Sequence, residues 1–66
     1  MRIDRVKLIT EMARKRMTVK KLSEITGLSP ATIASIRGGK SCTKAVGIVI
    51  AYALGVDPAD LIAEEE

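Results

Sequence analysis

Apolar residues recur at helical spacing near the start of the chain. Leu8 and Met12 lie four positions apart within residues 3–16. Ile9 and Ala13 repeat this spacing, and charged residues fall between the apolar ones. Such a pattern places the apolar side chains on one face of a helix. We therefore predict a first amphipathic helix over residues 3–16.

Capping residues and glycines divide the next part of the chain into short helices. Thr18 can cap a helix over residues 19–26, and Gly27 can end it in the left-handed conformation. A serine followed by proline is a strong start signal, because the hydroxyl caps the helix and proline suits its first position. The Ser29-Pro30 pair therefore predicts a third helix over residues 30–37, which a Gly-Gly pair would end.

Two more helices are expected in the second half of the chain. Thr43 can cap a helix over residues 44–54 that ends at Gly55. Its apolar residues lie on nearly every face, so we expect it to be the central and most buried helix. Asp57 followed by proline predicts a short fifth helix over residues 58–63.

The composition favours a small all-α fold. The chain has no Phe, no Trp and one Tyr, whereas strands are enriched in aromatic residues. A length of 66 residues holds a single domain. We expect a compact five-helix domain over residues 1–66. The acidic tail, residues 64–66, should fray because negative charge is unfavourable at a helix C-terminus.

Charge is divided unevenly along the chain. Residues 1–44 hold all eleven Lys and Arg residues and three acids, a net charge of +8. Residues 45–66 hold five acids and no base, a net charge of −5. This division suggests a basic face for a polyanion and an acidic end held away from it. A solvated basic face without a partner is the alternative.

Several kinds of chemistry lack the residues they need. Cys42 is the only cysteine and there is no His, so neither an internal disulfide nor a Cys/His pair can form. We expect no enzymatic activity, metal, cofactor or small-molecule ligand. The uncharged run over residues 45–56 is too short to cross a bilayer, which needs about 18 residues. A reducing, cytoplasmic location is the simplest expectation.

Residues 17–39 carry the most informative pattern. Their spacing fits two helices that cross closely around a tight turn. Three helix positions face inward, a small residue lies at the crossing, a glycine makes the turn, and an apolar residue fills it. The residues concerned are Leu22, Ser23, Gly27, Leu28, Ile33 and Ile36. This is a helix-turn-helix pattern over about residues 18–38. With two further helices after it, the chain resembles the lambda-repressor/Cro-like family of small bacterial and phage DNA-binding domains.

The resemblance implies that the helix over residues 30–37 lies in the major groove and that the preceding helix crosses the phosphate backbone. The outward face of the former would then read the bases, and groups on either side would bind phosphates. The implied base-reading residues are Ser29, Pro30, Ala31, Thr32, Ala34, Ser35 and Gly38. The implied phosphate-binding residues are Thr18, Val19, Lys20, Arg37, Lys40 and Lys44, with Lys21 and Arg16 as weaker candidates.

Two departures from the family pattern affect how the DNA would be read. Val19 occupies a position where many relatives have a glutamine that holds a phosphate. The reading face also lacks the Gln, Asn and Arg side chains that make bidentate base contacts. Ala31 and Ala34 can touch thymine methyl groups. We therefore expect recognition to rely on phosphate contacts, on DNA shape and on a dimer that spans two half-sites about 34 Å apart.

A homodimer would use apolar positions in the second half of the chain. These positions are Val49, Tyr52, Val56 and Pro58, which could equally be ordinary core or surface residues. The resulting hypothesis is a small transcriptional regulator that binds a pseudo-palindromic double-stranded operator. By resemblance, it would repress by occluding a promoter. The alternative is a protein-interaction module, such as an antitoxin or an anti-repressor, built on a helix-turn-helix domain.

Overall fold

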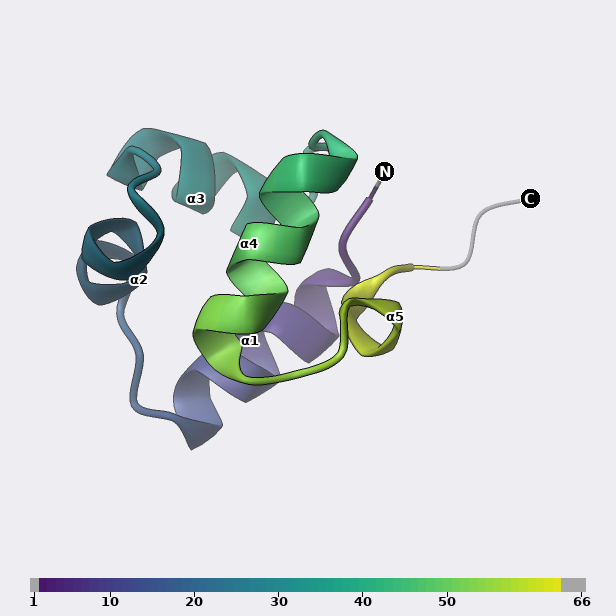
Figure 1. Cartoon of the computed structure of the whole chain (residues 1–66), viewed down its shortest axis with the longest axis horizontal. Helices are drawn as coiled ribbons and strands as arrows, with labels where there is room; N and C mark the ends of the chain where they lie inside the picture. The colour runs from purple at the N-terminus through teal and green to yellow at the C-terminus, as the bar shows by residue number, and fades with distance from the viewer. Residues whose placement is uncertain (1, 64–66) are drawn as a thin grey trace.

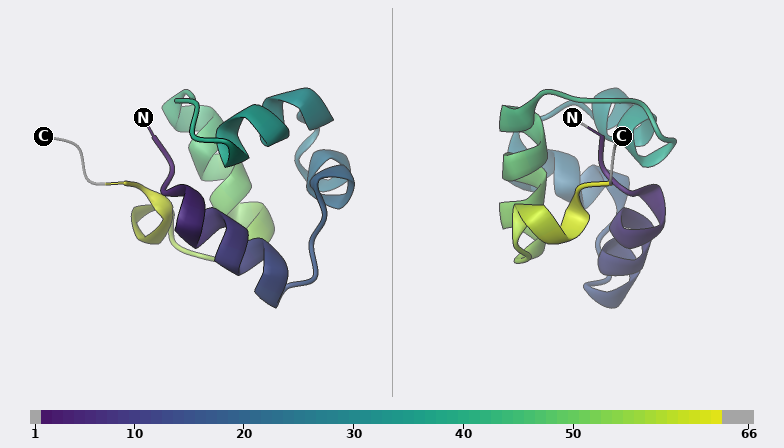
Figure 2. Two further views of the ribbon diagram at one scale, coloured as in Figure 1. Left: turned by 180° about the vertical axis from the view of Figure 1, so that it is seen from behind. Right: turned by 90° about the vertical axis from the view of Figure 1, so that its right-hand side faces the viewer.

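Five helices make up the part of the chain that the computed structural model describes, residues 2–63. They are α1 (Arg5–Arg14), α2 (Val19–Thr26), α3 (Pro30–Arg37), α4 (Lys44–Leu54) and α5 (Pro58–Leu61). α2 and α3 lie together at one end of the molecule and α5 lies at the other (Figure 1). α2 packs against α3 and α4, while α1 packs against α3 and α5 (Figure 2). The predicted all-α, five-helix fold is confirmed.

The predicted caps form the helix starts. The side-chain oxygens of Thr18, Ser29 and Thr43 each accept a hydrogen bond from the backbone N–H three residues later. Asp57 accepts from the N–H of Ala59 in the same way at the start of α5. These bonds satisfy N–H groups that have no partner within the helix. They are local interactions, which is why the sequence locates these starts correctly.

The outer ends of α1 and α5 differ from the prediction. α1 begins at Arg5 rather than at residue 3, because Asp4 caps it and accepts hydrogen bonds from the N–H groups of Val6 and Lys7. α5 ends at Leu61 because the next residue, Ile62, is extended. Ile62 forms an antiparallel bridge with Ile3, and this pairing of the two chain ends replaces the helical turns expected there. The predicted fraying of residues 64–66 lies outside the described residues.

The core is aliphatic and draws on every helix. It contains Ile3, Leu8, Met12, Leu22, Ile33, Ile36, Ile50, Ala51, Leu54 and Leu61. α4 contributes four buried residues, more than any other helix of the described part, as predicted. It is not enclosed, however, because Val49 and Tyr52 are exposed on one of its sides. On α1, Leu8 and Met12 are buried whereas Ile9 and Ala13 are exposed.

Gly27 provides a test of how the turn between α2 and α3 is made. Its φ of 79° lies in the left-handed region, and a Cβ atom added there would meet no atom within 4 Å. Replacing Gly27 with Ala should therefore cost only backbone energy, about 1 kcal/mol. We expect thermal unfolding to shift downwards by roughly 4–8 °C. Gly38→Ala is the matched control, because Gly38 has an ordinary φ of −81°. Equal effects of the two substitutions would contradict this account.

Candidate nucleic-acid interface

Side-chain hydrogen bonds hold the turn between α2 and α3. The Ser23 hydroxyl donates to the carbonyl oxygen of Leu28 across 2.5 Å. The Thr26 hydroxyl donates to the carbonyl of Leu22 at 2.7 Å and accepts from the N–H of Leu28 at 3.2 Å. Sequence reasoning assigned the small Ser23 to the helix crossing but missed Thr26. Because these bonds join the end of α2 to the turn, they fix the direction in which α3 leaves it.

The outward face of α3 consists of small side chains. Ile33 and Ile36 are buried beneath the helix. On the opposite side the residues predicted to read bases are all exposed: Ser29, Pro30, Ala31, Thr32, Ala34, Ser35 and Gly38. Small side chains leave the helix backbone accessible to a close neighbour. We call this surface the small-residue face.

Two hydroxyl groups at the start of the small-residue face are already engaged with each other. Ser29 Oγ accepts from the backbone N–H of Thr32 at 3.1 Å and donates to Thr32 Oγ1 at 2.9 Å. The Ser29 hydroxyl is therefore held as a helix cap, and its proton is used. Thr32 keeps its own hydroxyl proton for a further partner. If α3 contacts bases, the methyl groups of Ala31 and Ala34 are therefore freer to do so than the Ser29 hydroxyl.

The N-terminus of α2 lies on one flank of α3. Thr18, Val19 and Arg37 line one shallow depression, together with residues of α1 and the loop after it. The Val19 side chain packs against the core. The group that Val19 can offer to a bound anion is therefore its backbone N–H. The N–H groups of Val19 and Lys20 have no acceptor within the helix, and such a helix end favours anions. Arg37 is thus brought beside a backbone site suited to a phosphate.

The start of α4 and the loop before it lie on the other flank. Ala31 and Ser35 line a depression of about 270 Å³ with Lys40 and Thr43. The backbone N–H of Lys40 donates to the carbonyl of Ser35 at 3.0 Å, which ties the loop to α3. Lys44 is the exposed first residue of α4. Of the predicted phosphate-binding lysines, Lys40 therefore lies beside α3, and Lys44 follows it at the start of α4.

Cys42 lies in the same loop and is half-buried. Burial raises the pKa of the Cys42 thiol above its usual value. The thiol is therefore protonated at neutral pH, and a protonated thiol is a poor nucleophile. Its packing against the core agrees with a structural role before the cap of α4.

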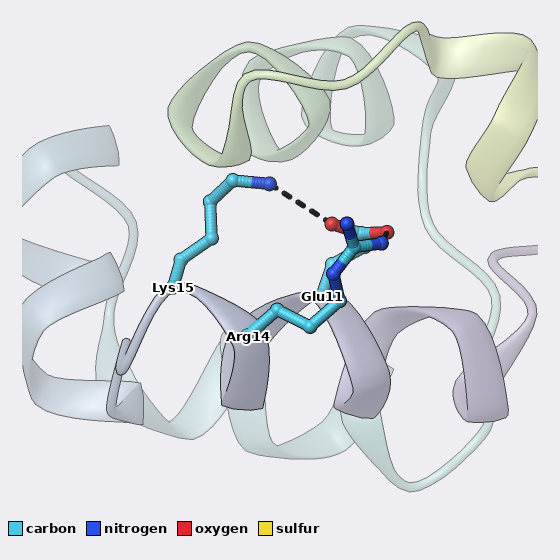
Figure 3. Close-up of polar contacts among 3 residues, drawn as sticks. All are labelled: Glu11, Arg14 and Lys15. Carbon is cyan, nitrogen blue, oxygen red and sulfur yellow. Dashed lines mark hydrogen bonds and ion pairs between the residues drawn. The ribbon is translucent and has the colours of Figure 1, made fainter.

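Two cations at the end of α1, Arg14 and the following Lys15, pair with one glutamate of the helix. Glu11 accepts from Lys15 Nζ at 2.9 Å and from Arg14 Nη1 at 3.1 Å (Figure 3). The hydrogen bond from Lys15 is the main cause that lowers the pKa of Glu11. The next residue, Arg16, has a positive φ of 53°. Glu11 therefore offsets one of the three positive charges in the basic run over residues 14–16.

The four residues predicted for a dimer differ in how far they are exposed. Val49 and Tyr52 lie three positions apart on α4, with 38% and 73% of their surface exposed. Val56 packs against the core and lines a depression with residues of α1 and α5. Pro58 is half-buried at the start of α5. Of these four residues, Val49 and Tyr52 are the exposed ones, and they form an open apolar face on α4.

Sequence reasoning missed Arg5, which the fold brings beside α3. Arg5 lines a shallow depression with Ala34, Arg37 and Gly38. No signal along the chain indicates this neighbourhood, because it depends on how α1 packs against α3.

The described residues offer neither a membrane span nor a metal cluster. No helix over residues 2–63 has both the length and the apolar character needed to cross a membrane. The same residues contain no group of three or more His, Cys, Asp or Glu side chains placed to hold a metal ion.

Comparison with solved structures finds this fold inside longer chains. A hydroxyethylphosphonate dioxygenase mutant superposes with a TM-score of 0.87 and 29% sequence identity. PhpD with cadmium matches with a TM-score of 0.84 and 27% identity. In both cases all of this chain is covered, but it spans only 14% of the other chain.

The family comparison is more direct. No curated protein matches the sequence. A family model described as a Cro/C1-type HTH DNA-binding domain matches residues 7–65, which include the whole small-residue face. The chain belongs to the Cro/C1-type helix-turn-helix DNA-binding domain family.

Proposed function

We propose that this protein is a small transcriptional regulator that binds double-stranded DNA with sequence preference by placing α3 in the major groove. One observation carries the proposal. The small-residue face of α3 is exposed along its length, with Arg37 and the N-terminus of α2 on one flank and Lys40 on the other. A groove about 12 Å wide admits one helix, and its phosphates lie along the two edges. A helix with an exposed face and cations beside it suits such a groove.

The base contacts would be mainly apolar. Ala31 and Ala34 are exposed, and their methyl groups suit the methyl group of thymine. Ser35 and Thr32 add single hydrogen bonds that distinguish bases less well than bidentate contacts do. Phosphate contacts and DNA shape would therefore supply much of the affinity and selectivity. On the two flanks, phosphates would be held by Thr18, Val19, Lys20, Arg37, Lys40 and Lys44.

The salt dependence of binding tests the phosphate contacts. If six phosphates are neutralised, the logarithm of the binding constant should fall with the logarithm of salt concentration with a slope of about −5. Fluorescence anisotropy with a duplex selected from a random pool measures this slope. A binding constant that does not change with salt would contradict the proposed interface. It would favour the protein-interaction alternative.

A regulator of this kind would act by occupying DNA rather than by catalysis. Repression would follow when the bound site overlaps a promoter. One observation supports the alternative of an interaction module: the matched dioxygenase and PhpD chains contain this fold as a small part of a longer protein. In such a module the partner would be another protein. The +8 charge of residues 1–44 favours DNA instead.

A homodimer on a two-fold operator completes the proposal. Val49 and Tyr52 form the open apolar face of α4, and Tyr52 is 73% exposed. Tyrosine is enriched at protein interfaces because it combines apolar area with a hydroxyl. We expect wild-type protein at tens of micromolar to sediment as a dimer, and Tyr52→Arg to sediment as a monomer. Val6→Arg is the matched control, since Val6 is 69% exposed on α1. A monomeric wild type would contradict this part.

A further inference from the structure

Three arginines surround the C-terminal end of α3, and two of them lie outside the helix-turn-helix. Arg5 and Arg37 line a depression of about 290 Å³ together with Ala34 and Gly38. Arg2 and Arg5 line an adjoining depression of about 350 Å³ at the end of the same helix. A Cβ atom built on Gly39 would lie 3.6 Å from Arg5 Cδ, so the Arg5 side chain runs close along this turn. We call Arg2, Arg5 and Arg37 the arginine cluster.

The backbone that carries Arg2 and Arg5 is held in place by the far end of the chain. The N–H of Ala63 donates to the carbonyl of Arg2 at 2.9 Å. The N–H of Asp4 donates to the carbonyl of Leu61 at 2.8 Å, and the Asp4 side chain caps α1. Arg5 is therefore the first residue of a capped helix rather than part of a loose arm. Less conformational entropy is lost when a preordered cation binds a partner.

The charges of the cluster are not balanced within the described part of the chain. Over residues 2–63 the ion pairs are those of Glu11 with Arg14 and with Lys15. The nearest acid in sequence, Asp4, directs its carboxylate to the N–H groups of Val6 and Lys7. Among the described residues that line the two depressions, these three arginines outnumber the single acid, Asp4, and a surface with net positive charge attracts polyanions. Guanidinium groups also match phosphate geometry well.

We propose that the arginine cluster binds backbone phosphates of DNA at the C-terminal end of α3, so that α1 extends the interface beyond the helix-turn-helix. The inference rests on the proposed function. It is supported by continuity: Ala34 of the small-residue face shares a depression with Arg5 and Arg37. DNA lying against that face therefore passes next to the cluster. Arg5 and Arg2 would add phosphate contacts that carry no base information.

Arg5→Gln tests this inference with a duplex that the wild-type protein binds. Loss of one phosphate contact should make the salt slope less steep by about 0.9. Affinity at 0.1 M salt should fall roughly fivefold to tenfold, by the same factor for preferred and unrelated duplexes. Arg5→Lys keeps the charge and should retain the wild-type slope. Lys7→Gln is the matched control, because Lys7 lies on the side of α1 that faces Val56 and Asp60.

Two outcomes would overturn the inference. Arg5→Gln could keep the wild-type salt slope but unfold at a lower temperature. The cluster would then only stabilise the C-terminus of α3, where cations interact favourably with the helix dipole. Equal slopes and equal unfolding temperatures would show that Arg5 does neither. A wild-type protein without measurable duplex affinity would overturn the proposed function as well, so the two failures are distinguishable.

Discussion

Replacing Ala34 with glutamate should reduce duplex affinity at least about a hundredfold, which corresponds to roughly 2.7 kcal/mol. Ala34 is exposed on the small-residue face and lies beside Arg5 and Arg37. In the proposed complex, a carboxylate there would be desolvated against base edges and would lie near phosphates. Like charges brought together at an interface cost several kcal/mol. The nearby arginines would also be drawn to the new carboxylate instead of to the DNA.

The fold should survive this change, because an exposed helix position tolerates glutamate. Circular dichroism and thermal unfolding check that point before binding is measured. Ala59→Glu provides the matched control: the same change is made at an exposed position of α5, far from α3 along the chain. The control should bind almost as tightly as the wild type. If Ala34→Glu also bound normally, α3 would not enter the groove.

Leu22→Ala should have the largest effect on stability. Leu22 is fully buried in α2, and its helix packs against both α3 and α4. Removing a buried leucine typically costs about 2–5 kcal/mol, from lost apolar contacts and the cavity left behind. A domain this small has little stability in reserve. We expect the unfolding temperature to fall by at least about 8 °C.

Ile25→Ala is the matched control for Leu22. It lies on the same helix, but 51% of its surface is exposed. The expected loss is below about 1 kcal/mol, because the side chain is only partly removed from water on folding. Urea unfolding of the two variants, read against the wild type, gives both values. Equal losses would mean that α2 does not pack as the structure shows.

Local chemistry made most of the fold predictable. The starts of α2 to α5 depend on a side chain and backbone groups two or three residues away, as at Thr18 and Ser29. The ends of α2 and α4 depend on glycines with positive φ, Gly27 and Gly55. The groups that make these interactions lie within a few residues of one another, so the sequence is sufficient to locate them.

The start of α1 was missed although its cap, Asp4, is local, and a second error arose where distant parts of the chain meet. Ile3 and Ile62 are apolar and adjoin helical patterns, so they are consistent with helix as well as with extended structure. The bridge between them decides in favour of extended backbone. In the candidate interface, the exposed face of α3 followed from the spacing of Ile33 and Ile36. The mutual hydrogen bond of Ser29 and Thr32 did not, because it depends on which way each hydroxyl turns.

The sequence by itself determined five helices, the caps of α2 to α5 and the outward face of α3, because helical periodicity and capping act within a few residues. Tertiary structure alone decided that Arg37 lies beside both the N-terminus of α2 and Arg5 of α1. It also decided that the Val49 and Tyr52 side of α4 stays open whereas Val56 turns to the core. These neighbourhoods depend on how whole helices pack against one another, and no local pattern specifies that.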